Sequence, residues 1–243
     1  MSKPTKELYD WQEFTKKSDE KYRKVQECGD YSGLEKHNIL SKTDFEMNFM
    51  REYSRKFFGI ELMGKALDVC CGIGYMSESL RNKGFEVSGL ELNHDAVDVA
   101  TKKYPEINFV QGDAVTPEKY FDGEKFNLIY IREAHPFSRV CDADMQIPLV
   151  EKYLGLLNEK GVLVIAHATK GGGMSCRSVD FKLLEQLASD VGGGFSGPHN
   201  IFFLKHLRLP VNKFNLAVTS TLSQIVQEVT NFRWIEYVFL CKR

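Results

Sequence analysis

The segment that most constrains this chain is Leu67–Tyr75, which reads LDVCCGIGY. An apolar run carries an acid, Asp68, and leads into a Gly-x-Gly turn made by Gly72 and Gly74. Glycines in such a turn let the backbone approach a ligand closely, and the first N–H groups of the following helix point toward that ligand. The Asp68 carboxylate adds negative charge at the same place. The segment therefore predicts a strand–turn–helix unit that suits a ligand with an ammonium or sulfonium group better than one with a pyrophosphate.

The composition describes an ordinary globular chain with one sizeable core. Its 243 residues are 43% hydrophobic and 27% charged, and 32 basic residues nearly balance 33 acidic ones. This balance argues against a nucleic-acid or anionic-membrane surface, since both need an excess of positive charge. The first residues lack the apolar run of a signal peptide, and no apolar stretch is long enough to span a bilayer.

The six cysteines show neither a C-x-x-C pair nor the His/Cys spacing of a zinc site. Two of them, Cys70 and Cys71, are adjacent inside the glycine turn. We therefore expect reduced thiols, no metal and a cytoplasmic protein.

Strand and helix patterns alternate through the middle of the chain. Strands are expected at 65–70, 85–90, 107–111, 126–131 and 162–167, and helices at 75–83, 93–104, 117–120 and 145–157. Such alternation is typical of a parallel sheet with helices on both faces. The predicted fold class is α/β, with a Rossmann-like, mostly parallel sheet and a reversed C-terminal strand at 234–241.

The two ends of the chain are expected to be additions to this sheet. Residues 1–60 are predicted to form an N-terminal helical lid or extension, and residues 61–243 the main domain. Aromatic residues at helical spacing, Phe45, Phe49, Tyr53 and Phe57, indicate an amphipathic helix that ends near Gly59. After the glycine runs 171–173 and 192–194, which we interpret as loops around a helix at 180–189, a strand at 199–209 and a helix at 216–229 are expected.

Further acids follow the next predicted strands. Glu91 stands at the carboxyl end of the second strand, where a carboxylate can accept hydrogen bonds from both hydroxyls of a ribose. Asp113 follows the third strand and can accept from an exocyclic amine, while the N–H of Ala114 can reach a ring nitrogen. The carboxyl ends of parallel strands are where open α/β sheets bind ligands. These residues therefore predict one nucleoside-like binding site.

In these motifs the chain resembles the class I S-adenosylmethionine-dependent methyltransferases, over about residues 64–167. Gly72 and Gly74 match the cofactor loop of that family, and Cys70 replaces its first glycine. The resemblance implies S-adenosylmethionine as cofactor, bound by Asp68, Cys70, Gly72, Gly74, Tyr75, Glu91, Leu92, Asp113, Ala114 and Arg132. An NAD-binding Rossmann fold is the main competitor, but it would need a third glycine where Ser77 stands and has no use for Asp68.

The loop after the fourth strand offers the candidate acceptor side. His135 could act as a general base, because an imidazole titrates near neutral pH, or it could be a structural loop residue. Ala134-His135-Pro136-Phe137 partly echoes the loop of amino-group methyltransferases, but Ala134 replaces their polar residue. Arg132 could pair with Glu133, pair with an internal acid or meet an acidic substrate.

The expected function is methyl transfer to the oxygen or nitrogen of a small molecule. The donor is already activated, so alignment of acceptor and methyl group supplies much of the catalysis. The alternatives are a macromolecule (RNA or protein) methyltransferase, a non-catalytic cofactor-binding or interaction protein on the same fold, and aminopropyl transfer from a decarboxylated cofactor.

Overall fold

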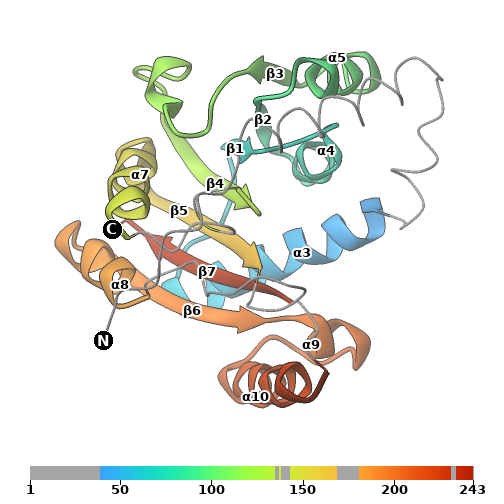
Figure 1. Ribbon diagram of the computed structural model, residues 1–243, viewed down its shortest axis with the longest axis vertical. Coiled ribbons are helices and arrows are strands. Elements are labelled where there is room, and N and C mark those ends of the chain that lie inside the picture. Colours follow the sequence, from blue (N-terminus) through green and yellow to red (C-terminus); the bar gives the residue numbers. More distant parts are fainter. Residues whose placement is uncertain (1–38, 135–136, 138–142, 169–180, 231–233, 243) are drawn as a thin grey trace, which may run out of the picture.

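The fold is built on a seven-stranded sheet with the strand order β3-β2-β1-β4-β5-β7-β6 (Figure 1). The computed structural model describes residues 39–134, 137, 143–168, 181–230 and 234–242. The strands are β1 Lys65–Val69, β2 Glu86–Glu91, β3 Asn108–Gln111, β4 Phe126–Arg132, β5 Leu157–Ala168, β6 Gly194–Asn200 and β7 Ile235–Cys241. Neighbours from β3 to β5 pair in parallel, whereas β7 runs antiparallel to both β5 and β6. The predicted mostly parallel sheet with a reversed C-terminal strand is confirmed.

Helices cover both faces of this sheet. They are α3 Ile39–Tyr53, continued by a π-helical turn at Ser54–Phe58, then α4 Tyr75–Asn82, α5 His94–Lys103, a 3₁₀ turn at Pro117–Lys119, α7 Ala143–Gly155, α8 Phe181–Asp190, α9 Phe202–His206 and α10 Lys213–Thr230. Asn93 caps α5 by accepting a hydrogen bond from the Ala96 N–H at 2.8 Å, as its sequence position predicts. Gly59 ends the helical segment after α3 in the left-handed region, with φ of 70°.

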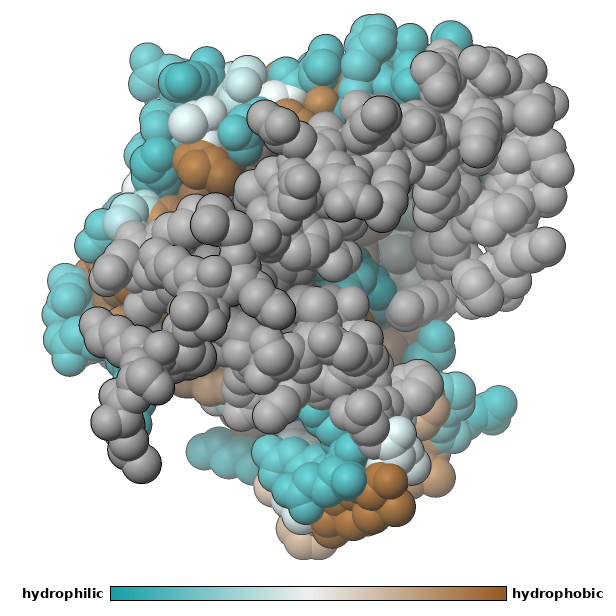
Figure 2. Space-filling view, viewed as in Figure 1, coloured by the Kyte–Doolittle hydropathy of each residue, from teal (hydrophilic) through white to brown (hydrophobic). Residues whose placement is uncertain are grey.

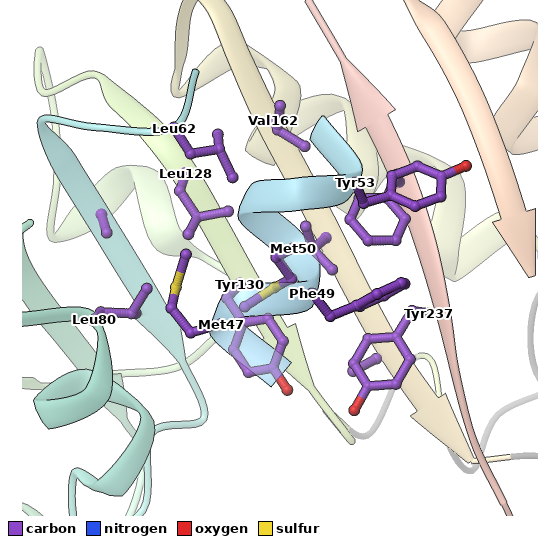
Figure 3. Packing of buried hydrophobic residues seen from close by; sticks show 14 of the residues in the cluster. Met47, Phe49, Met50, Tyr53, Leu62, Leu80, Leu128, Tyr130, Val162 and Tyr237 are labelled. Carbon is purple, nitrogen blue, oxygen red and sulfur yellow. The ribbon is translucent and has the colours of Figure 1, made fainter. Parts of the chain in front are cut away.

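Alternate residues of the central strands point to opposite faces of the sheet and belong to two separate hydrophobic clusters. Leu128 and Tyr130 of β4 pack with α3 and α4, whereas Ile129 and Ile131 pack with α7 and α8. Figure 3 shows the first cluster, in which Met47 of α3 lies between Leu80 of α4 and Tyr130 of β4. Each fully buried side chain of this size stabilises the fold by about 1.5–3 kcal/mol.

The predicted N-terminal part lies mostly outside the described residues, since these begin at Ile39. Its helix α3 shares the hydrophobic cluster of the sheet through Phe49 and Tyr53. The division of the chain at residue 60 and the function of residues 1–38 as a lid stay predictions.

The predicted strand at 199–209 is wrong. β6 ends at Asn200, whose side-chain oxygen accepts from the Phe202 N–H at 3.0 Å, and α9 begins there. The glycine run at 192–194 is a loop only in part, because Gly194 pairs with Cys241 in the sheet. The other predicted glycine loop, at 171–173, lies outside the described residues. Within the described ranges, no helix has the length and apolar character needed to cross a membrane.

Candidate functional site

Asp68 is a buried acid near the carboxyl end of β1, with 1% of its surface exposed. Its Oδ2 accepts a hydrogen bond from the Ser77 hydroxyl at 2.6 Å. Ser77 lies in the first turns of α4, so the strand–turn–helix unit brings it back over the strand. Burial raises the pKa of Asp68 to about 7, although Ser77 and Arg132 lower it. The site therefore holds a carboxyl group that becomes an anion near neutral pH and gains from a positively charged ligand.

The raised pKa of Asp68 predicts that the ligand-free protein loses stability as the pH rises. In the unfolded chain the carboxyl titrates near about 3.9, so between about pH 4 and 7 the folded state holds the extra proton. The free energy of unfolding should then fall by up to about 1.4 kcal/mol per pH unit through this group. Asp68→Asn should flatten that slope, measured by urea unfolding from pH 4 to 8. Identical slopes in the variant and the wild type would contradict the assignment.

The turn after β1 follows a left-handed path at three positions. Cys70, Gly72 and Gly74 have φ angles of 60°, 56° and 83°. The backbone N–H groups of Cys70 and Cys71 both donate to the Leu90 carbonyl, at 2.8 and 3.2 Å, and so fix the turn to β2. The left-handed conformation costs a non-glycine residue about 1–2 kcal/mol, so Cys70 adopts it against its preference. Burial raises the pKa of both thiols well above their usual value, which fits packing side chains rather than nucleophiles.

Glu91 ends β2 beside this turn, and its carboxylate is fixed by the backbone. Oε2 accepts from the Gly72 N–H at 2.9 Å, and Oε1 accepts from the Asn93 N–H at 3.0 Å. Burial raises the pKa of Glu91, and these N–H donors oppose the rise. The next residue, Leu92, leaves 50% of its side chain exposed. The end of β2 thus offers an oriented carboxylate next to an accessible apolar side chain.

Asp113 is exposed after β3 and belongs to a tight turn. Its Oδ1 accepts from the Val115 N–H at 2.9 Å, and its own N–H donates to the Tyr120 hydroxyl at 3.2 Å. The carbonyl of Ala114 accepts from the Tyr153 hydroxyl at 2.7 Å, which ties this turn to α7. Asp68, Glu91 and Asp113 accordingly stand at or just past the carboxyl ends of three neighbouring strands, β1, β2 and β3.

The side chain of Tyr75, a predicted site residue, is placed with other partners. The Tyr75 side chain packs with Ile73, Ala96 and Val99 between α4 and α5, and its hydroxyl accepts from Lys103 Nζ at 3.3 Å. Only the backbone of Tyr75, at the start of α4, belongs to the glycine turn. His135 lies outside the described residues.

Arg132 closes β4 in a buried polar cluster. Its Nη1 donates to Glu46 Oε2 at 2.5 Å, and the Tyr130 hydroxyl donates to the same oxygen at 2.9 Å. Of the partners considered for Arg132, an internal acid, Glu46, is one that it meets. Figure 3 shows Tyr130 and Tyr237 on the side of the sheet that α3 covers. Glu46 was missed by sequence reasoning, because it lies 86 residues before Arg132 and no local pattern links the two. Ser77 could have been found, since its position in the first turns of α4 follows from the glycine turn.

The comparisons with known proteins agree with this architecture. Residues 66–161 match a family model described as a methyltransferase domain. Two plantazolicin methyltransferases of known structure are similar to this chain in fold. The first is BamL in complex with a triazolic desmethylPZN analog and SAH. Its TM-score is 0.59 at 16% sequence identity, and the match covers 95% of this chain and 98% of BamL. BpumL, in complex with SAH, has a TM-score of 0.56 at 17% identity, covering 96% and 99%.

A third similar structure is a TehB-like SAM-dependent methyltransferase from Corynebacterium glutamicum, with a TM-score of 0.52 at 20% identity, covering 94% of this chain and 98% of that one. At these identities the likeness concerns the fold alone. No curated protein sequence matches the chain significantly. The chain thus contains a methyltransferase domain at residues 66–161 and shares the overall fold of these solved methyltransferases.

Proposed function

We propose that the chain binds S-adenosylmethionine at the carboxyl ends of β1, β2 and β3 and methylates an oxygen or nitrogen of a small molecule. The observation that carries this proposal is the Glu91 carboxylate, which is held by the Gly72 and Asn93 N–H groups. An acceptor fixed in this way loses little entropy when it binds a ribose. The left-handed turn and the apolar surface of Leu92 beside it are the other parts that such a cofactor requires.

The residues of the site fit the cofactor's chemical groups. Glu91 would accept from the ribose hydroxyls, Asp113 from the adenine amine, and the Ala114 N–H would donate to an adenine nitrogen. The N–H groups around Cys70, Gly72, Gly74 and Tyr75 would face the methionine part. When bound, S-adenosylmethionine supplies an electrophilic methyl carbon on a positively charged sulfur.

Two charged residues would shape the rest of the site. Asp68 would favour that positive charge by ionising, because its pKa lies at about 7 in the ligand-free protein. Arg132, held by Glu46, would border the site at the end of β4.

The acceptor is proposed to be a small molecule, and His135 the base that removes its proton where the acceptor is a hydroxyl. The near balance of 32 basic and 33 acidic residues supports a small molecule over RNA, because the chain has no overall excess of positive charge. One protein of similar fold is the plantazolicin methyltransferase BamL, in complex with a triazolic desmethylPZN analog and SAH, which makes such an analog a reasonable first acceptor to try. The free thiols Cys70 and Cys71 support a reducing compartment such as the cytoplasm.

Glu91→Ala tests the cofactor site. The loss of hydrogen bonds to a charged acceptor, worth about 1.5–3 kcal/mol each, should weaken S-adenosylmethionine binding by at least about 10-fold in calorimetry. Glu86→Ala is the matched control, because Glu86 is an exposed glutamate at the opposite end of the same strand. Equal affinities for the two variants, both folded, would remove Glu91 from the site.

The acceptor class needs a separate measurement. The protein should transfer a labelled methyl group from S-adenosylmethionine to the small-molecule fraction of a cell extract. Label in the RNA or protein fraction would support the macromolecule alternative. Tight cofactor binding with no label in any fraction would favour the non-catalytic alternative.

A further inference from the structure

Helix α10 presents an apolar stripe to solvent. Phe214, Val218, Leu222, Ile225 and Val229 are 76%, 39%, 39%, 52% and 80% exposed. They follow one another at intervals of four, four, three and four residues, so they lie on one face of the helix. Figure 2 shows hydrophobic residues gathered at the lower edge of the molecule, where Figure 1 places α10. A contiguous exposed patch of this kind marks an interaction surface.

The opposite face of α10 already attaches the helix to its own chain. Leu216, Thr219 and Ser223 are buried there, and the Thr219 hydroxyl donates to the Asn200 carbonyl at 3.4 Å. The stripe therefore takes no part in this attachment. The charged residues of the helix are Lys213 in its first turn and Glu228 in its last. Exposed apolar side chains thus stand where a solvated helix would carry charges.

The outer four residues of the stripe are symmetric about its midpoint, which lies between Thr221 and Leu222. If two such helices pack antiparallel about a two-fold axis at this point, Phe214 faces Val229, and Val218 faces Ile225. The same arrangement brings the Lys213 end of each helix next to the Glu228 end of the other, whereas a parallel pair would place like charges together. The pattern is therefore self-complementary in the antiparallel orientation.

We propose that the occupant of this surface is a second copy of the chain, joined by antiparallel packing of the two α10 helices. The 18-residue helix is about 27 Å long, and its apolar stripe runs along almost all of it. Intervals of three and four residues are those that place side chains along one seam between two packed helices. This association concerns a surface other than the cofactor site, and it does not depend on the proposed function.

Sedimentation velocity over a range of protein concentrations tests the association. The wild type should form a dimer, and Val218→Glu or Ile225→Glu should weaken it at least about 100-fold, because each dimer would bury two unpaired charges. Val191→Glu is the matched control, since Val191 lies outside the stripe and is 38% exposed, nearly the same as Val218 at 39%. Thermal unfolding checks that each variant is folded, and cofactor affinity should stay unchanged in all of them.

Two further variants test the orientation. Lys213→Glu and Glu228→Lys should each weaken the dimer by about 2- to 10-fold, and the double variant should restore it. Thr221→Cys, near the axis, should form a disulfide-linked dimer under mild oxidation above the wild-type background. Val229→Cys should not, because the two copies of residue 229 would lie about 20 Å apart.

A folded wild type that stays monomeric at every concentration overturns the proposal and leaves residues 1–38 or another protein as the occupant. A dimer that Ile225→Glu leaves intact also overturns it. Efficient linkage through Val229→Cys overturns the antiparallel orientation.

Discussion

Gly72→Val should abolish S-adenosylmethionine binding while the protein remains folded. Gly72 has a φ of 56°, a conformation that a β-branched side chain rarely adopts, so valine would force the turn into another shape. The Gly72 N–H would then leave Glu91, and the branched side chain would occupy the space that the methionine part of the cofactor needs. Strain of about 1–2 kcal/mol and steric exclusion together should weaken binding by more than about 100-fold.

Gly123→Val separates the loss of the site from ordinary backbone strain. Gly123 has a φ of 74°, and a side chain there would meet no atom within 4 Å. It precedes the amino end of β4, whereas the proposed site lies at the carboxyl ends of the strands, so its replacement should cost a similar amount of stability and leave cofactor affinity intact. Calorimetric titration of both variants decides the question. Normal binding by Gly72→Val would show that the turn has been misplaced.

Glu46→Ala should cost about 3 kcal/mol of folding stability, the lower end of the range for breaking a buried ion pair. Glu46 is 2% exposed and is the shared acceptor for Arg132 and Tyr130, so alanine would leave a largely buried guanidinium and a buried hydroxyl without this acceptor. The Arg132 side chain is 23% exposed, and water can offset part of the loss. Unfolding in guanidinium chloride, fitted with one m-value for both proteins, measures the change in the free energy of unfolding.

The double variant Glu46→Leu with Arg132→Met tests the physical cause. If the uncompensated charge dominates the loss, the double variant should be more stable than Glu46→Ala, because an apolar pair of similar volume carries no buried charge. A loss below about 1 kcal/mol for Glu46→Ala would mean that the pair acts like an exposed ion pair.

The parts of the site that the sequence predicts are those whose geometry is local. Asn93 caps α5 through an N–H three residues away, and Glu91 meets an N–H two residues away. Residue types and spacing are enough to predict such contacts. The Glu46–Arg132 pair joins the first described helix to the fourth strand, and only the packing of α3 on the sheet brings them together.

The error at β6 has a related cause. Its sequence, GFSGPHN, contains two glycines and a proline, which are depleted in strands. The segment is a strand because β7 pairs with it, and the register shifts between Ser196 and His199 to accommodate the irregular stretch. The seven residues of β6 alone do not indicate that β7 will pair with them.

The position of β7 between β5 and β6 has a consequence for how the chain is synthesised. β6, with α8, α9 and α10 around it, leaves the ribosome before its sheet partner β7. Until residues 235–241 emerge, the backbone groups of β6 and of the outer edge of β5 have no strand to pair with among those described. An unpaired edge is a template for aggregation. At about 5–20 residues per second, the 35 residues from Ile201 to Ile235 expose these edges for seconds in every new chain. The last described strand thus fills the gap between two strands that are translated before it, which makes this side of the sheet dependent on late, long-range pairing.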